Sequence, residues 1–168
     1  MATLAHDQSL PADVARFGTG QTTARDLSIA RGRLRDVSAV ARLHRRCFRK
    51  ALAYRMSTLL ILRMMPRSAF LIARVGDEIV GNVIGDVQGG QSRVISICVD
   101  PAWRQQGIGS RLLNEIETAL PDGNMILMVE ATNTAAHLLY RAHGYLSVGE
   151  SRDYYGRGKH GIWMQKNR

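Results

Sequence analysis

The chain of 168 residues is long enough for one domain with a substantial core, and its 45% hydrophobic and 22% charged residues are typical of a globular protein. No apolar run approaches the roughly 20 residues of a membrane-spanning helix, and the first residues lack the pattern of a secretory signal, so we expect a cytoplasmic protein. Cys47 and Cys98 stand far apart without metal-ligand spacing, which predicts reduced thiols and no metal site.

The formal net charge of +9 predicts attraction to polyanions. The one compact basic run, residues 42–50, has the spacing of the solvent-exposed face of a helix. We therefore interpret the charge as a contribution to solubility and steering, and we expect no dedicated nucleic-acid partner.

Residues 1–26 show little periodicity and several turn-forming residues, so we expect a poorly ordered or loosely docked extension there and one domain over residues 27–168. A short first strand is predicted near Ile29, and Asp36 is the predicted N-cap of a helix. A second helix is predicted over residues 57–65 and ends before Pro66, although the apolar run at residues 59–62 also fits a strand.

Two apolar segments at residues 69–74 and 78–86 flank Gly76-Asp77 and predict a β-hairpin. A second turn at residues 88–91 leads into a central strand that ends near Val99. A helix from Ile108, a strand over residues 124–131, a helix that ends at Gly144 and two further strands complete the chain. This order predicts one mixed α/β (α+β) sheet with helices on both faces.

The stretch from Val94 to Leu113 combines a strand, a glycine turn and a helix, which together form an anion site. The first-turn amides of a helix have no carbonyl partners, and the helix dipole places positive potential where they point. The dinucleotide-binding fingerprint requires a third glycine where this chain has Leu112, and the Gly-Lys-Ser/Thr of a P-loop is absent.

Two motifs resemble those of the GNAT superfamily of N-acetyltransferases. The first is Arg104-x-x-Gly107-x-Gly109 after a strand that ends in Val-Asp-Pro. The second runs from Asn133 through Tyr140 to Gly144-Tyr145. Together they anchor about residues 26–166, and their order and spacing are hard to obtain by chance.

The resemblance implies a mixed, mostly antiparallel sheet of six to seven strands with about four helices, and acetyl-CoA as the cofactor. It implies that backbone groups of Ile97 and Val99 bind the pantetheine arm, that Asn133 binds near the thiol, and that Tyr140 protonates the leaving thiolate. It also implies a pyrophosphate site formed by Arg104, Gln105, Gln106, Gly107, Ile108, Gly109 and Ser110.

Each of these residues has a simpler interpretation when it is taken alone. Tyr140 could be a core aromatic whose hydroxyl finds a partner, Asn133 could be only a helix cap, and the glycines could form only a turn. The joint occurrence of all of them at the spacing of the family favours the cofactor site.

The C-terminal stretch resembles RimI-type ribosomal-protein-alanine acetyltransferases and related protein N-terminal acetyltransferases. It carries Tyr154 and Tyr155 in the connection between the last two predicted strands. The resemblance implies that this pair clamps the backbone of a peptide whose α-amine enters the site. The alternative is an exposed hairpin rich in tyrosine, which favours strands.

One departure concerns the general base. That subgroup commonly has Glu or His five residues before the motif asparagine, where this chain has Met128. Glu130 lies two residues further and therefore faces the same side of the strand, so it is the candidate base. An α-amine has a pKa of about 8, so a weak base is sufficient. Cys98 and His160 are interpreted as a core residue and a surface residue rather than as catalytic groups.

The leading hypothesis is an acetyl-CoA-dependent N-acetyltransferase that acts on a protein or peptide N-terminus, including a ribosomal one, by direct attack in a ternary complex. A second hypothesis is acetylation of a small amine, and a third is a catalytically weak acyl-CoA sensor. The expected partners are acetyl-CoA and the acceptor, with no membrane, and the expected assembly is a monomer or a homodimer.

Overall fold

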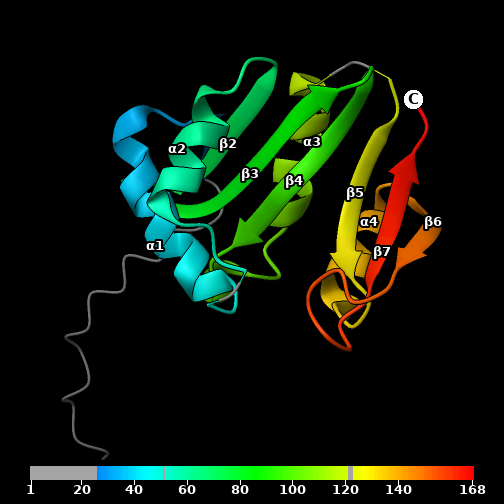
Figure 1. Ribbon diagram of the computed structural model, residues 1–168. Helices are drawn as coiled ribbons and strands as arrows, with labels where there is room; N and C mark the ends of the chain where they lie inside the picture. The colour runs from blue at the N-terminus through cyan, green and yellow to red at the C-terminus, as the bar shows by residue number, and fades with distance from the viewer. Residues whose placement is uncertain (1–25, 51, 121–122) are drawn as a thin grey trace, which may run out of the picture.

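A computed structural model describes residues 26–50, 52–120 and 123–168 (Figure 1). The extension predicted for residues 1–26 lies outside the described residues, apart from Asp26. None of the helices in the described ranges is long and apolar enough to cross a membrane.

The described residues form one seven-stranded sheet and four α-helices, as the sequence predicted. The strands lie in the order β1-β2-β3-β4-β5-β7-β6, and all neighbours are antiparallel except β4 and β5. In chain order the elements are β1 (Leu27–Arg31), α1 (Val37–Cys47), α2 (Met56–Met64), β2 (Ser68–Val75), β3 (Glu78–Gln88), β4 (Gln91–Val99), α3 (Ile108–Ala119), β5 (Met125–Glu130), α4 (Thr134–Ala142), β6 (Leu146–Ser151) and β7 (Gly161–Lys166), with 3-10 turns at Leu34–Asp36 and Pro101–Trp103.

Two hydrophobic cores lie on opposite faces of the sheet. Helices α1 and α2 cover one face, and α3 and α4 cover the other (Figure 1). Strand β2 contributes to both because successive side chains point to opposite faces. Leu71 belongs to the core under α3, whereas Phe70 and Ile72 belong to the core under α1 and α2. The predicted mixed sheet with helices on both faces is therefore confirmed.

The predicted cap of α1 is correct in position but not in mechanism. Asp36 immediately precedes α1, yet its carboxylate makes no capping bond to that helix. The carboxylate instead accepts the backbone N–H of Arg33 at 2.7 Å and forms an ion pair with Arg74 of β2. Gly144 does end α4 in the predicted left-handed conformation, at a φ of 84°.

Strands β4 and β5 separate soon after they begin. Their parallel ladder pairs only three residues of each strand, and it ends at Val94 and Leu127. Further along, the amide of Asp100 donates to the carbonyl of Val80 on β3 at 2.8 Å. Because such bonds alternate along an antiparallel pair, the backbone groups of Ile97 and Val99 point away from β3, toward the side of β5.

Candidate active site

The turn between β4 and α3 exposes the N-terminus of α3. Gly107 precedes the helix with a φ of 76°, and a side chain there would meet no described atom within 4 Å. The amides of Ile108, Gly109 and Ser110 open the helix and have no acceptor within it. The local geometry thus fits the predicted anion site.

Arg104 makes a hydrogen bond within the same region. Its Nε donates to the carbonyl of Val99 at 3.2 Å, and its predicted part in the anion site, with Gln105 and Gln106, stays a prediction. The same carbonyl accepts the thiol of Cys47 at 3.4 Å. Arg104 is exposed and also lies beside the thiol of Cys47, so the guanidinium lies along the end of β4.

Tyr140 lies in the main core. It is 5% exposed, and its ring centroid lies 5.8 Å from that of Tyr145. Burial raises the pKa of Tyr140 above its usual value, and the neighbouring Tyr155 adds to the effect. No described group forms a hydrogen bond with its hydroxyl. Tyr140 is therefore a protonated phenol with a free donor, next to Tyr155.

Asn133 caps α4, as the simpler interpretation proposed. Its Oδ1 accepts the backbone N–H of Ala136 at 3.2 Å. The side chain is exposed, and its amide nitrogen donates to no described residue. The cap therefore occupies only the oxygen, and the predicted contact of Asn133 with the cofactor stays a prediction.

Glu130 shares a face of β5 with Met128, as predicted, because Leu127 and Val129 alternate with them into the core. The carboxylate of Glu130 is not free, since Arg49 Nη2 lies 2.7 Å from its Oε2. The glutamate side chain is 19% exposed and that of Arg49 is 47% exposed. Any proton that Glu130 accepts must therefore compete with this ion pair.

Tyr154 and Tyr155 lie in the connection between β6 and β7, on the face of the sheet that carries Glu130. Their rings meet edge to face with centroids 4.9 Å apart. The hydroxyl of Tyr155 donates to the backbone carbonyl of Met128 at 3.0 Å, which holds the connection against β5. Burial, followed by the neighbouring Tyr154 and Tyr54, raises the pKa of Tyr155 to about 12.

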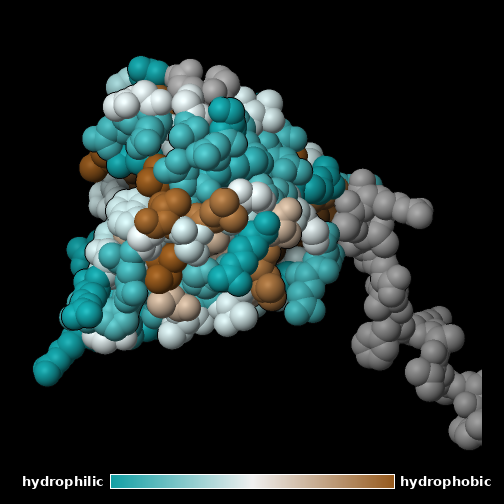
Figure 2. Space-filling model, turned by 90° about the vertical axis from the view of Figure 1, so that its right-hand side faces the viewer, coloured by the Kyte–Doolittle hydropathy of each residue, from teal (hydrophilic) through white to brown (hydrophobic). Residues whose placement is uncertain are grey.

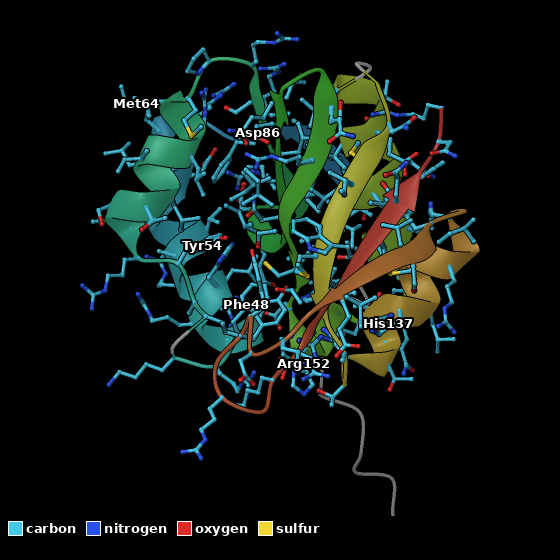
Figure 3. All side chains as sticks on the ribbon, turned by 45° about the vertical axis from the view of Figure 1, so that its right-hand side comes forward. Phe48, Tyr54, Met64, Asp86, His137 and Arg152 are labelled. Carbon is cyan, nitrogen blue, oxygen red and sulfur yellow. The ribbon has the colours of Figure 1, made fainter. Side chains whose placement is uncertain are left out.

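An aromatic group that was not among the predicted site residues lies on the opposite side of this region. His44 of α1 is fully buried, and its ring lies 5.2 Å from Phe48 and 5.6 Å from Tyr54, both in the connection between α1 and α2 (Figure 3). His44 Nε2 lies 3.1 Å from Asn82 Oδ1, and burial lowers the pKa of His44. The sequence signal for this group was the presence of two aromatic residues, Phe48 and Tyr54, in the short connection between two helices.

The two side chains left out of the predicted catalytic set lie as expected. Cys98 is 6% exposed and belongs to the core under α1 and α2. His160 is half-buried in the connection between β6 and β7, where its Nδ1 accepts the amide of Asp153 at 3.1 Å. The thiol of Cys98 also contacts that of Cys47, which raises the pKa of Cys98 together with its burial.

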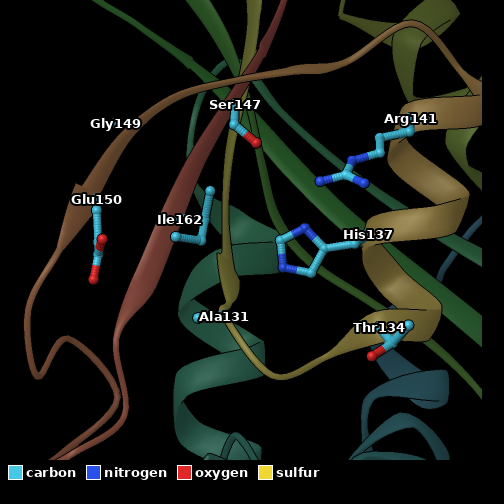
Figure 4. Close-up of a pocket in the computed structure, with 8 residues that line it drawn as sticks. All are labelled: Ala131, Thr134, His137, Arg141, Ser147, Gly149, Glu150 and Ile162. Atoms are coloured by element: carbon cyan, nitrogen blue, oxygen red, sulfur yellow. The ribbon is translucent and has the colours of Figure 1, made fainter.

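A separate hollow of about 620 Å³ lies between α4 and strands β6 and β7 (Figures 2 and 4). His137 and Arg141 of α4 point toward it, and Glu150 of β6 lies across from them (Figure 4). Neither ring nitrogen of His137 has a described partner. None of the predicted site residues lines this hollow, so the predicted site is the opening between β4 and β5.

That opening brings most of the predicted residues together. A Cβ at Gly109 would lie 3.4 Å from Leu139 of α4, so the first turn of α3 packs against α4 there. Tyr155 is bonded to the carbonyl of Met128, one residue beyond the end of the ladder at Leu127, and Glu130 lies two residues further along β5. The arrangement offers backbone amides for an anion, strand groups for an extended ligand, and a buried phenol.

Comparisons with known proteins agree with this geometry. Residues 66–146 match the model of the acetyltransferase (GNAT) domain. Over 94 residues the chain is 37% identical to the N-alpha-acetyltransferase RimI of Mycobacterium tuberculosis, covering 54% of this chain and 60% of that relative. It is 28% identical to an uncharacterized N-acetyltransferase of Methanocaldococcus jannaschii, covering 80% of this chain and 87% of the relative.

Solved structures share the fold over 84% of this chain. The ribosomal-protein-S18-alanine N-acetyltransferase of Escherichia coli has a TM-score of 0.75 at 23% identity and is covered over 93% of its length. The PaiA N-acetyltransferase of Thermoplasma acidophilum, solved in complex with coenzyme A, has a TM-score of 0.73 at 16% identity and is covered over 99%. Residues 66–146 thus match a GNAT acetyltransferase domain, and the solved structures show that the chain shares their fold over 84% of its length.

Proposed function

We propose that this protein is an N-acetyltransferase that moves an acetyl group from acetyl-CoA to the N-terminal α-amine of a protein or peptide. The observation that carries the proposal is the opening between β4 and β5, with the buried phenol of Tyr140 at its closed end and Tyr154 and Tyr155 beside it. The 37% identity to a RimI N-alpha-acetyltransferase supports the choice of an α-amine acceptor.

The residues present fit coenzyme A. The amides of Ile108–Ser110 would hold the pyrophosphate, and no side chain at Gly107 obstructs them. The outward backbone groups of Ile97 and the amide of Val99 would pair with the pantetheine arm, whereas the carbonyl of Val99 already accepts Arg104 and Cys47. Arg104, Gln105 and Gln106 flank the same turn, and the free amide nitrogen of Asn133 would bind near the thiol.

Acetyl-CoA supplies a thioester carbonyl that a neutral amine can attack. Tyr140 then acts as a general acid, because a protonated phenol without a competing acceptor can donate to a departing sulfur. Burial keeps Tyr140 protonated at any cellular pH, since it disfavours the phenolate. The water-excluded core beside the phenol strengthens this hydrogen bond.

The amine must lose a proton before or during attack. Glu130 is the candidate that accepts it, directly or through water, and Arg49 holds the glutamate in place at 2.7 Å. An α-amine with a pKa of about 8 is partly neutral at cellular pH, so a weak base is sufficient.

The first test is thiol release from acetyl-CoA with mass spectrometry of the products, across peptides that differ at the first residue and a panel of small amines. Acetylation of peptide α-amines supports the proposal. Turnover with small amines alone contradicts the acceptor class. Tight coenzyme A binding without turnover favours a sensor, for which the proton-inert Met128 and the paired Glu130 are the supporting observations.

A further inference from the structure

Two connections flank the proposed acceptor entrance, and both are basic. One joins α1 to α2 and the other joins β6 to β7. Arg49 of the first pairs with Glu130 of β5, and Tyr155 of the second donates to the backbone carbonyl of Met128 on the same strand, so both connections lie against the end of β5. Figure 3 labels Phe48 in the first connection and Arg152 in the second.

Six cations and one carboxylate occupy these two connections. The cations are exposed and comprise Arg49, Lys50, Arg55, Arg152, Arg157 and Lys159. Asp153 is the carboxylate, and its Oδ1 accepts the amide of Gly158 at 2.6 Å. Glu130, at the nearby end of β5, pairs with Arg49. Within the described ranges the other five cations have no ion-pair partner.

Five unpaired cations around one entrance repel one another and attract anions, more strongly at low ionic strength. An acceptor peptide that places its α-amine at the closed end must run outward between these connections. At about 3.3 Å per extended residue, its third to sixth residues lie about 10–20 Å from the amine, at the level of an entrance rim.

The structure assigns an acceptor class on this basis: we infer that the protein acetylates N-termini with Asp or Glu in the residues after the second. This inference rests on the proposed function. Acidic side chains in those positions pair with the entrance cations, whereas a basic peptide is repelled. The same cations also disfavour a protonated amine, which helps a site whose candidate base is already paired.

The test compares three peptides of one sequence that carry Glu, Gln or Lys at positions three to five. At low salt the Glu peptide should have a kcat/KM roughly tenfold above that of the Gln peptide, because three partly screened ion pairs contribute modestly. The Lys peptide should be slower still. The advantage of the Glu peptide should shrink as sodium chloride rises to 0.5 M, since the pairs are solvent-exposed.

The matched variant replaces Arg152, Arg157 and Lys159 with Gln. Arg49 stays in place, because its removal would also free Glu130. The triple variant should lose most of the preference for the Glu peptide. The control is Arg35→Gln. Arg35 is an exposed cation just before α1, about 20 Å along that helix from the connection that follows it. This variant should preserve the preference.

A binding measurement separates attraction from chemistry. Fluorescence anisotropy with labelled, already acetylated Glu and Gln peptides should show the same order of affinities and the same loss in the triple variant. Equal kcat/KM for the three peptides and equal affinity for the two labelled peptides would overturn the inference but leave the proposed function intact. Turnover of small amines with no peptide acetylated would overturn both.

Discussion

At the scale of single residues, Tyr140 carries the proposed chemistry because it combines burial with a free hydroxyl. The neighbouring Tyr145 is equally buried, but its hydroxyl donates to Glu117 Oε1 at 2.9 Å. Two tyrosines 5.8 Å apart therefore have different roles. One is held in a structural hydrogen bond, and the other keeps its donor for a reacting group.

Tyr140→Phe removes that donor and leaves the ring packing intact. The expected result is a fall in kcat of about 10²-fold, the lower end of what a general acid contributes, with little change in coenzyme A affinity. Tyr145→Phe is the matched control and should lower the melting temperature while kcat stays within about twofold. Equal kcat values for the two variants would contradict the role of Tyr140. Steady-state kinetics and calorimetric binding make the comparison.

The buried His44 predicts a pH dependence of stability. Burial lowers its pKa in the folded protein below the 6.5 of an exposed histidine, so the folded state binds fewer protons than the unfolded state. Its stabilising contribution is complete above pH 6.5 and is lost as the pH falls through and below that value.

Between pH 7.5 and 5.5 this loss should reach at most about 1.4 kcal/mol in the free energy of unfolding. His44→Gln should lose less over the same interval, because glutamine does not titrate. Urea unfolding at both pH values measures the difference. Identical losses in the two proteins would mean that His44 is not the responsible group.

At the scale of elements, the sequence predicted the seven strands and four α-helices of the described region, with only α2 also open to a strand interpretation. β2 is a short apolar run that is buried on both faces, and glycine turns separate β2, β3 and β4. It did not predict how Asp36 would be used, since this side chain pairs with Arg74, which is far along the chain. Long-range partners such as Arg49 for Glu130 depend on the fold and have no local sequence signal.

Gly85 of β3 is required by close packing rather than by a turn. A side chain there would lie 2.5 Å from the carbonyl oxygen of Arg93 on β4 and 2.7 Å from Leu120. Gly85→Ala should therefore cost about 1–3 kcal/mol of unfolding free energy, the usual cost of overpacking, because a backbone carbonyl in a sheet cannot move aside.

Gly149→Ala on β6 is the control for that variant. Its nearest contact would be Trp163 at 3.8 Å, an ordinary distance, so stability should change by no more than about 0.5 kcal/mol. Chemical denaturation of both variants decides the matter. A loss at Gly149 as large as that at Gly85 would show that strand propensity, not the contact with Arg93, sets the cost.

At the scale of the whole molecule, the opening that forms the proposed site also divides the sheet. Only three residue pairs join β4 to β5, so strands β5, β7 and β6 depend on other contacts with the rest. Helix α3 provides them. Glu117 of α3 binds Lys166 of β7 at 2.6 Å, and Arg168 donates to the carbonyls of Glu117 at 2.8 Å and Leu120 at 2.7 Å. The C-terminal segment thus secures the two parts of the sheet through one helix.

This view predicts that Glu117 and Lys166 are energetically coupled. Their side chains are 12% and 27% exposed, so solvent screens the pair only in part. A double-mutant cycle with Glu117→Gln, Lys166→Met and the combined variant should give a coupling of about 1 kcal/mol in unfolding free energy, at the upper end for surface pairs. The coupling should fall at high salt. A value near zero would mean that Tyr145 and Arg168 alone hold Glu117, and that β7 is fixed to α3 by packing rather than by charge.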